Sequence, residues 1–381
     1  MTKYSYYLLL SCLMFLAGCQ TVEPLAIDYM LPADVSFPPS LKRVAIVNNM
    51  PEVPDNKPIL AKEKKKDDFE IASKTDYYNG NAAIATESLA EALAHENYFN
   101  EVVICDSALR AHDVTPREGA LSQEETNRLV HDLDVDFLIA LENVQIRSVR
   151  KIKYMRDWGI YYGTVDARIY PTVRIYLPNR STPMATINAN DSIFWEETGN
   201  GPFVQGNLIS EEELIKQASD FAGTIPVKKL LPYWKTANRY LFCGGSVNMR
   251  DAAVYARDKQ WNTAIGLWKQ TYATQKGKKK MQAAYNLAVG YEIQDSIAAA
   301  LDWALKAQAE ARIVDGVDKK DLTHLGKADI PYYVLTTLYA TELKERKEGL
   351  SRLNMQMQRF NNDFSSNTVN VIVFLLPLNI H

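Results

Sequence analysis

The chain has 381 residues, 47% of them apolar and 23% charged, with a formal net charge of −3 at pH 7. These values are ordinary for globular domains, and the length allows two domains or three, each with its own core. Because basic residues do not outnumber acidic ones, the composition gives no support to a protein that binds nucleic acid.

The N-terminal residues have the order of a bacterial secretory signal. Lys3 precedes an apolar stretch, Tyr6 to Phe15, which is too short to cross a bilayer. Leu16-Ala17-Gly18-Cys19 follows and resembles the lipobox. The resemblance implies a signal peptide over residues 1–18 and a lipid on Cys19. Because Gln20 follows, it also implies an outer-membrane anchor, which we expect on the periplasmic face. The alternative is an ordinary signal peptide with an incidental cysteine.

Residues 19–40 contain prolines at positions 24, 32, 38 and 39 and little periodicity, so we expect a tether. Residues 41–209 are predicted to form an α/β domain. Its first part has strand, helix, strand, helix and strand patterns in turn, which predicts a partly parallel sheet. The elements are strands at 43–47, 101–106 and 137–141 and helices at 81–95 and 122–133, the second opened by a capping box at Ser122 and Glu125.

An alternating pattern follows at residues 164–177, where Val165, Ala167 and Ile169 alternate with polar residues. A turn at 178–181 leads to a second alternating run that ends at Ile193. This pattern is typical of half-buried antiparallel strands. We therefore expect a hairpin that extends the sheet and leaves a polar face exposed.

Helical patterns dominate the rest of the chain. Residues 210–245 are predicted to be connecting helices, with Gly244-Gly245 as the domain boundary. Residues 246–360 contain a repeat close to the 34-residue spacing of tetratricopeptide units, with Ala264 and Ala300 36 positions apart. We expect a TPR-like helical domain there, an unrelated array of helical hairpins being the alternative. Residues 361–381 are predicted to form an apolar tail, either a final strand or an adhesive apolar segment. The predicted fold class is therefore α+β.

Aromatic residues suggest two kinds of binding site. In the repeats, TPR-like stacks present binding surfaces, so we expect partner contacts at Tyr255, Trp268, Tyr291 and Trp303. Near the hairpin, Trp158, Tyr161 and Tyr162 could stack on a sugar ring, although such residues more often close a hairpin or a small core.

The sequence offers no catalytic motif. Histidines and cysteines lack metal-ligand spacing, and neither a nucleophile elbow nor a phosphate-binding glycine loop is present. We therefore expect no metal, no cofactor and no enzymatic activity. Cys105 and Cys243 are the cysteines of the folded part, and buried thiols and a disulfide both remain open.

The order of elements from Arg43-Val44-Ala45-Ile46-Val47 to Phe137-Leu138-Ile139 resembles the α/β domain of curli-secretion lipoproteins and of lipoprotein activators of penicillin-binding proteins. The whole arrangement resembles an uncharacterised family of Bacteroides-type envelope lipoproteins. We expect a non-enzymatic adaptor that binds an envelope protein through its TPR-like helices. The alternatives are a ligand- or carbohydrate-binding lipoprotein and an oligomeric export component whose hairpin inserts into the membrane.

Overall fold

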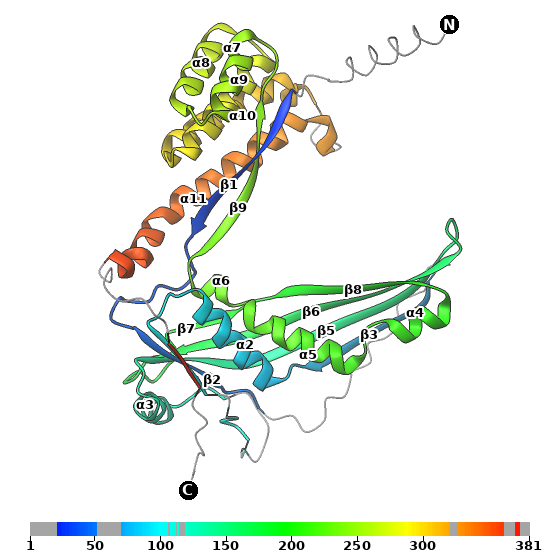
Figure 1. Cartoon of the computed structure of the whole chain (residues 1–381), viewed down its shortest axis with the longest axis vertical. Helices are drawn as coiled ribbons and strands as arrows, with labels where there is room; N and C mark the ends of the chain where they lie inside the picture. The colour runs from blue at the N-terminus through cyan, green and yellow to red at the C-terminus, as the bar shows by residue number, and fades with distance from the viewer. Residues whose placement is uncertain are drawn as a thin grey trace, which may run out of the picture. The chain divides into compact units, whose positions relative to one another are not determined.

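The computed structural model describes residues 21–51, 70–105, 107–111, 113, 119–320, 326–361 and 370–373. The chain divides into two compact units (Figure 1). The helical unit comprises the chain up to Leu31 together with Trp234–Leu353, and the sheet unit comprises Pro32–Tyr233 and the chain from Asn354 onward. The predicted α+β class is confirmed, and each unit is described by itself below.

The sheet unit is built on parallel strands. β2 (Arg43–Asn48) lies between β4 (Glu101–Cys105) and β5 (Phe137–Met155), parallel to both. α2 (Ala82–His95) and α3 (Gln123–Asp132) provide the crossovers, and α3 begins with the predicted Ser122–Glu125 capping box. The predicted alternation of strands and helices is therefore confirmed. In the apolar tail, β10 (Asn370–Val373) adds a further parallel strand beside β4.

Side chains of the parallel strands alternate between two cores. Val44, Ile46 and Ile139 pack with α2 in the larger core. Ala45 and Leu138 point to the opposite face, into the smaller core that includes Leu129 of α3. Strands buried on both faces become continuous apolar runs, which is why these three were recognisable from the sequence.

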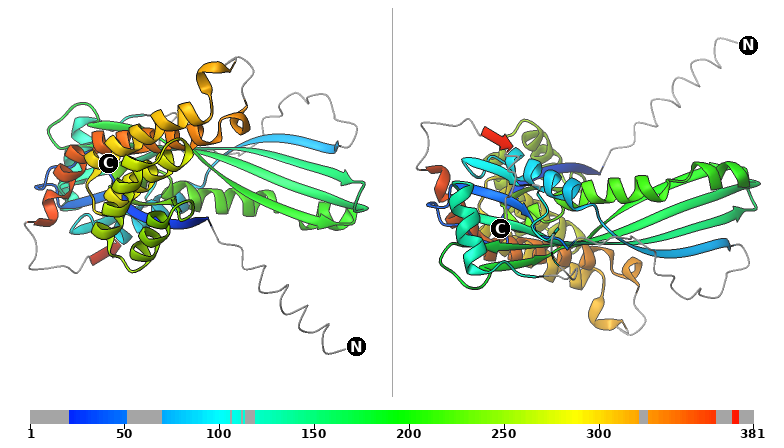
Figure 2. Two further views of the ribbon diagram at one scale, coloured as in Figure 1. Left: turned by 90° about the horizontal axis from the view of Figure 1, so that it is seen from above. Right: turned by 90° about the horizontal axis from the view of Figure 1, so that it is seen from below.

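A long hairpin of β5 and β6 (Ile160–Tyr176) extends the sheet far beyond its parallel part, as Figure 2 shows. Near its base β6 pairs with β7 (Ala185–Asn188). Toward its tip β5 pairs with β3 (Glu70–Asn79) and β6 pairs with β8 (Asp191–Gly199), all antiparallel. The expected hairpin strands exist, but the arm that precedes them, residues 142–155, and the strand β3 were missed.

Helices cover one face of this extension. α4 (Gly201–Asn207) and α5 (Glu211–Thr224) pack on β6, and α6 (Val227–Leu230) follows them. Gly163 makes the close approach of α4 possible, because a Cβ there would lie 2.5 Å from a methyl of Val204. α5 starts after Ser210, whose hydroxyl accepts a hydrogen bond from the Glu213 amide. The segment 210–232 therefore belongs to the sheet unit and is not a connector.

The helical unit contains antiparallel helices that pack in chain order: α7 (Val247–Arg257), α8 (Trp261–Thr274), α9 (Lys278–Ile293), α10 (Ile297–Val314) and the first part of α11 (Pro331–Asn361). Short 3₁₀ turns, η1 (Val317–Lys319) and η2 (Lys327–Asp329), lie between the last two. Alanines, including Ala264, Ala288 and Ala300, are fully buried and allow the helices to approach closely. α9 is the centre of the array, and its Gly290 faces Ile265 and Trp268.

A two-stranded ribbon of β1 (Val22–Leu31) and β9 (Tyr233–Phe242) packs on these helices. The strands are antiparallel, because Thr21 pairs with Cys243 while Asp28 pairs with Thr236. The predicted tether over residues 19–40 is therefore wrong for 22–31. Pro24 argued against a strand in the sequence. In the structure its side chain is exposed on a two-stranded ribbon, where the missing N–H of a proline is tolerated.

The predicted helical domain, 246–360, also needs correction at both ends. It gains the ribbon, and the end of α11 belongs to the sheet unit instead. There Gln356 is buried and bonds to the backbone of Ala33 and Val35, and Arg359 donates to the carbonyl of Leu41. The hydrophobic pattern of a long helix such as α11 is continuous, so the sequence does not indicate where the helix leaves one unit and begins to pack in the other.

The contact between α2 and α5 depends on Gly223. A Cβ at this position would lie 2.5 Å from the backbone nitrogen of Leu89 and 2.8 Å from the carbonyl of Ala85. We expect Gly223→Ala to lower the free energy of unfolding of the sheet unit by about 1–3 kcal/mol, since neither backbone atom can move aside cheaply. The matched control is Gly206→Ala in α4, where a Cβ meets nothing within 4 Å. Denaturant titration should show a control at least as stable as the parent, and equal behaviour of both variants would contradict this packing.

Candidate functional site

The aromatic residues near the hairpin do not form one site. Trp158 lies in the turn between β5 and β6 and is 72% exposed. Tyr161 points toward the α4 side, where its ring packs at a tilt against the ring of Tyr154, with 5.1 Å between the centroids. Tyr162, the next residue in the strand, points to the opposite face and donates to Glu196. Because Tyr161 and Tyr162 face opposite sides of the sheet, they cannot stack on the same sugar ring.

The aromatic residues of the repeats have different environments. Trp268 is fully buried in the core of the helical unit, so its assignment as a partner contact is wrong. Tyr255 is 37% exposed. Tyr291 and Trp303 are partly buried and lie beneath the ammonium groups of Lys269 and Lys306. Three of the four residues therefore remain accessible in part, on different helices.

The apolar face of the hairpin is already occupied. Val165, Ala167 and Ile169 are fully buried in the core of the sheet unit, which also contains residues of α4 and α5. The other face presents Asp166 and Arg168 to solvent, in agreement with the predicted alternation. Insertion of this hairpin into lipid would require α4 and α5 to leave the apolar face.

A polar cluster lies at the carboxyl ends of the parallel strands, where open α/β sheets usually bind ligands. Glu142 is buried and accepts hydrogen bonds from Tyr176 and Asn49, both at 2.8 Å. Burial raises the pKa of Glu142 and, together with the charge of Glu142, raises the pKa of Tyr176 to about 12. Arg110 donates to Asn49 in turn. These internal bonds fix the strand ends and leave the carboxylate no exposed surface for a ligand.

The sequence contained a signal for this cluster that was overlooked. Glu142 interrupts the apolar run that begins at Phe137, and a charge within such a run is costly unless it is paired. Its partners, Asn49 and Tyr176, are remote in sequence and could not be identified from spacing.

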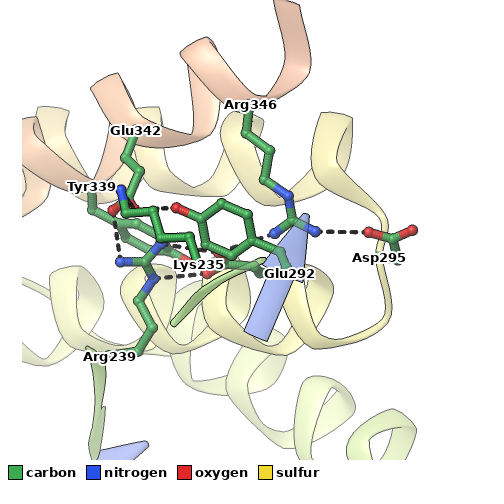
Figure 3. A network of polar contacts seen from close by, with 8 residues as sticks. Lys235, Arg239, Glu292, Asp295, Tyr339, Glu342 and Arg346 are labelled. Carbon is green, nitrogen blue, oxygen red and sulfur yellow. Dashed lines mark hydrogen bonds and ion pairs between the residues drawn. The ribbon is translucent and has the colours of Figure 1, made fainter. Parts of the chain in front are cut away.

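A second charged network lies in the helical unit, between the ribbon and helices α9 and α11 (Figure 3). The guanidinium of Arg239, from β9, donates to both oxygens of Glu292 at 2.9 and 3.0 Å. From α11, Tyr339 donates to Glu292 at 2.7 Å and Arg346 lies 3.3 Å from it. Glu292 is 2% exposed, so its charge is balanced entirely by these neighbours.

Glu342 completes the network on the ribbon side. It accepts hydrogen bonds from Arg239 at 2.8 Å, from Lys235 at 2.9 Å and from Tyr29. Arg346 continues to Asp295 and also covers the ring of Tyr29, 4.4 Å from its centroid. Because opposite charges are paired throughout, the network fixes the position of the ribbon on α9 and α11, since any other arrangement would leave a buried charge unpaired.

An accessible pocket lies between α10 and α11. It has a volume of about 640 Å³. Its floor is apolar, with Leu301 and Ala340 buried and Leu305 48% exposed. The rim is formed by Gln308, Thr341, Lys344, Lys347 and Glu348. None of these residues was predicted as a site, because the two helices contribute them from positions about 40 apart and each looks like an ordinary amphipathic residue.

The remaining predictions concern cysteines, metals and membrane spans. Cys19 lies outside the described residues. Cys105 and Cys243 are buried and are not joined by a disulfide, and burial raises the pKa of the Cys243 thiol to about 11. Within the described ranges, no group of histidine, cysteine and carboxylate side chains could hold a metal ion. Of the helices in those ranges, none is both long and apolar enough to span a bilayer.

These features define an α+β protein with an extended sheet unit and a helical-array unit. Residues 41–242 match the family model "Domain of unknown function (DUF8603)", which covers more than half of the chain, so the chain belongs to this family. Residues 250–345 match a second model, "Domain of unknown function (DUF6340)". No curated protein and no solved structure matches the chain.

The buried network predicts a large cost for removing its central charge. Glu292→Gln keeps the shape of the side chain but removes the buried anion that Arg239 and Arg346 share, and leaves them only their more exposed partners, Glu342 and Asp295. We expect the free energy of unfolding of the helical unit to fall by about 3–5 kcal/mol. Glu348→Gln removes a carboxylate from an exposed pair with Lys344 and should cost less than about 0.5 kcal/mol. Equal denaturation midpoints for the two variants would show that the network is not stabilising.

Acid should weaken the same network through Glu342. Burial would raise the pKa of this carboxyl, but hydrogen bonds from Tyr29, Lys235 and Arg239 outweigh it and lower the pKa to about 2. A carboxyl with a lowered folded-state pKa stabilises the fold above its unfolded value and loses that contribution as the pH falls toward its folded value. Thermal melting should therefore show Glu342→Gln below the parent at pH 7. The difference should shrink as the pH falls from about 5 to 2, and a constant difference would contradict the assignment.

Proposed function

We propose that this chain is a lipid-anchored envelope protein that acts as a non-enzymatic adaptor. The lipobox resemblance at Cys19 supports anchoring, and Gln20 supports the outer membrane, with the protein on the periplasmic face. The observation that carries the adaptor role is the pocket between α10 and α11, which has an apolar floor and a charged rim. Such a groove accommodates the apolar face of an amphipathic segment.

The site that we propose differs from the inner surface that TPR stacks usually offer. In this chain the ribbon of β1 and β9 packs on α9, where the Asn286 side chain bonds to both the N–H and the carbonyl of Phe242. Part of the array is therefore already occupied by the protein's own strands. None of the residues that line the pocket between α10 and α11 belongs to the ribbon.

The rim defines the chemistry of the partner segment. Lys344 and Lys347 provide two cations against one carboxylate, Glu348, and the Lys344–Glu348 pair is wide at 4.0 Å with both side chains about two-thirds exposed. An exposed pair of this kind contributes little, so a partner can displace it. We propose a segment of another envelope protein that places apolar side chains over Leu305 and a carboxylate beside the two lysines.

The test compares two substitutions in one helix. Leu305→Gln makes the floor of the pocket polar, and Ile313→Gln changes a residue that is 73% exposed and does not line the pocket. After crosslinking in intact cells and affinity purification, we expect a defined partner to be recovered about tenfold less with Leu305→Gln than with Ile313→Gln, since one well-placed apolar contact is worth about 1.4 kcal/mol or more.

Point substitutions are preferable to deleting the whole helical domain. Such a deletion would also remove the end of α11, which belongs to the sheet unit. Recovery of the same partner by both variants would overturn the proposed pocket. Failure of the unsubstituted protein to crosslink to any envelope protein would overturn the adaptor function itself.

A further inference from the structure

A run of lysines at positions 276, 278, 279 and 280, interrupted by Gly277, spans the end of the connection between α8 and α9 and the start of α9. Lys276, Lys278 and Lys279 are exposed, and Lys280 is partly buried against Glu310 at 2.7 Å. The run crosses the start of α9, with three lysines in the first turn of that helix and no acidic residue there. Cations at this end of a helix oppose its dipole, so helix stability does not explain them.

These lysines lie beside the start of the ribbon. The carbonyl of Thr21 accepts from the amide of Cys243 at 2.9 Å, and a Cβ on Gly244 would lie 3.2 Å from the Thr21 methyl group. A Cβ on the next residue, Gly245, would lie 3.7 Å from methylene carbons of Lys279. Two consecutive glycines thus separate Thr21 from the lysine run, and all of these residues belong to the helical unit.

The positive charge of this surface is largely unopposed. Within the described part of the chain, Lys276 and Lys279 form no ion pair or hydrogen bond. Lys278 lies over the ring of Tyr332 at 4.8 Å, a contact that leaves its charge intact. Val247, two residues after Gly245, is 60% exposed. A cluster of lysines beside an exposed apolar side chain is the composition of a surface that binds the interface of an anionic membrane.

We propose that Lys276, Lys278, Lys279 and Val247 form a surface that binds anionic lipid headgroups. The inference rests on the proposed anchor, because two residue steps separate Cys19 from Thr21 and span at most about 7 Å. An acylated Cys19 would therefore hold this surface near the headgroups. Acyl chains and a basic patch are complementary signals, and together they fix both attachment and orientation.

The test uses the mature chain from residue 19 onward with Cys19→Ser, which cannot be acylated, in cosedimentation with vesicles. We expect binding to vesicles of phosphatidylcholine with about one-third phosphatidylglycerol, little binding to phosphatidylcholine alone, and release at about 1 M salt, where the Debye length is about 3 Å. The triple variant Lys276→Gln, Lys278→Gln and Lys279→Gln should bind at least about tenfold more weakly, since each lysine near an anionic surface contributes roughly a factor of five.

The matched control removes the same charge elsewhere in the helical unit, with Lys259→Gln, Lys306→Gln and Arg352→Gln. The control triple should bind the vesicles like the parent. Equal losses in both triples would show an effect of net charge alone, and equal binding to neutral and anionic vesicles would show no headgroup selectivity. Either result overturns the proposal.

Acylation is measured separately, from the mass of the N-terminal peptide of the full chain made in cells. Selective vesicle binding without acylation supports the lysine surface and overturns the anchor. Acylation without selective binding leaves the anchor in place and overturns the lysine surface.

Discussion

The helical unit depends on the neutralisation of one buried carboxylate. Glu292 is almost completely removed from solvent. Its charge is compatible with the core only when Arg239 of β9 and Arg346 and Tyr339 of α11 contact it. A buried ion pair adds little net stability compared with apolar packing, but an incomplete one is very unfavourable. The network therefore selects one arrangement of the ribbon on the helices and penalises every arrangement that leaves a charge unpaired.

This arrangement decides which surfaces are available for binding. A helical array without the ribbon would expose α9, whose residues from Met281 onward are mostly buried. With the ribbon in place, Phe242 packs on Tyr285 and the strand backbone bonds to Asn286, so that surface serves folding. The repeat pattern in the sequence correctly indicated packed helical pairs, but Trp268, a residue that looked suitable for a partner, is needed in the core.

The elements that could be predicted are those whose burial follows from local composition. The strands at 43–48, 101–105 and 137–141 are apolar on both faces, and the caps at Ser122 and Ser210 mark helix starts directly. β9 was missed because its inward position 239 is an arginine, which is acceptable there only through Glu292, 53 residues later. The outer part of β5 was missed for a similar reason, since Arg147, Arg150 and Lys151 obscure its alternation. The pocket between α10 and α11 was beyond prediction because its lining requires knowledge of helix packing.

The position of β1 changes how an anchor would act. A long tether after Cys19 would let the protein sample many orientations above the membrane. Since β1 begins at Val22 and is bonded to β9, an acylated Cys19 would be joined almost directly to a folded unit. This short connection would limit which faces of the helices can contact lipid. It would also raise the effective concentration of nearby basic groups at the headgroups. A partner that binds the pocket between α10 and α11 would then encounter an adaptor with a fixed orientation. The anchor would already have removed part of the rotational freedom that the adaptor loses on binding, so the entropic cost of association would be lower.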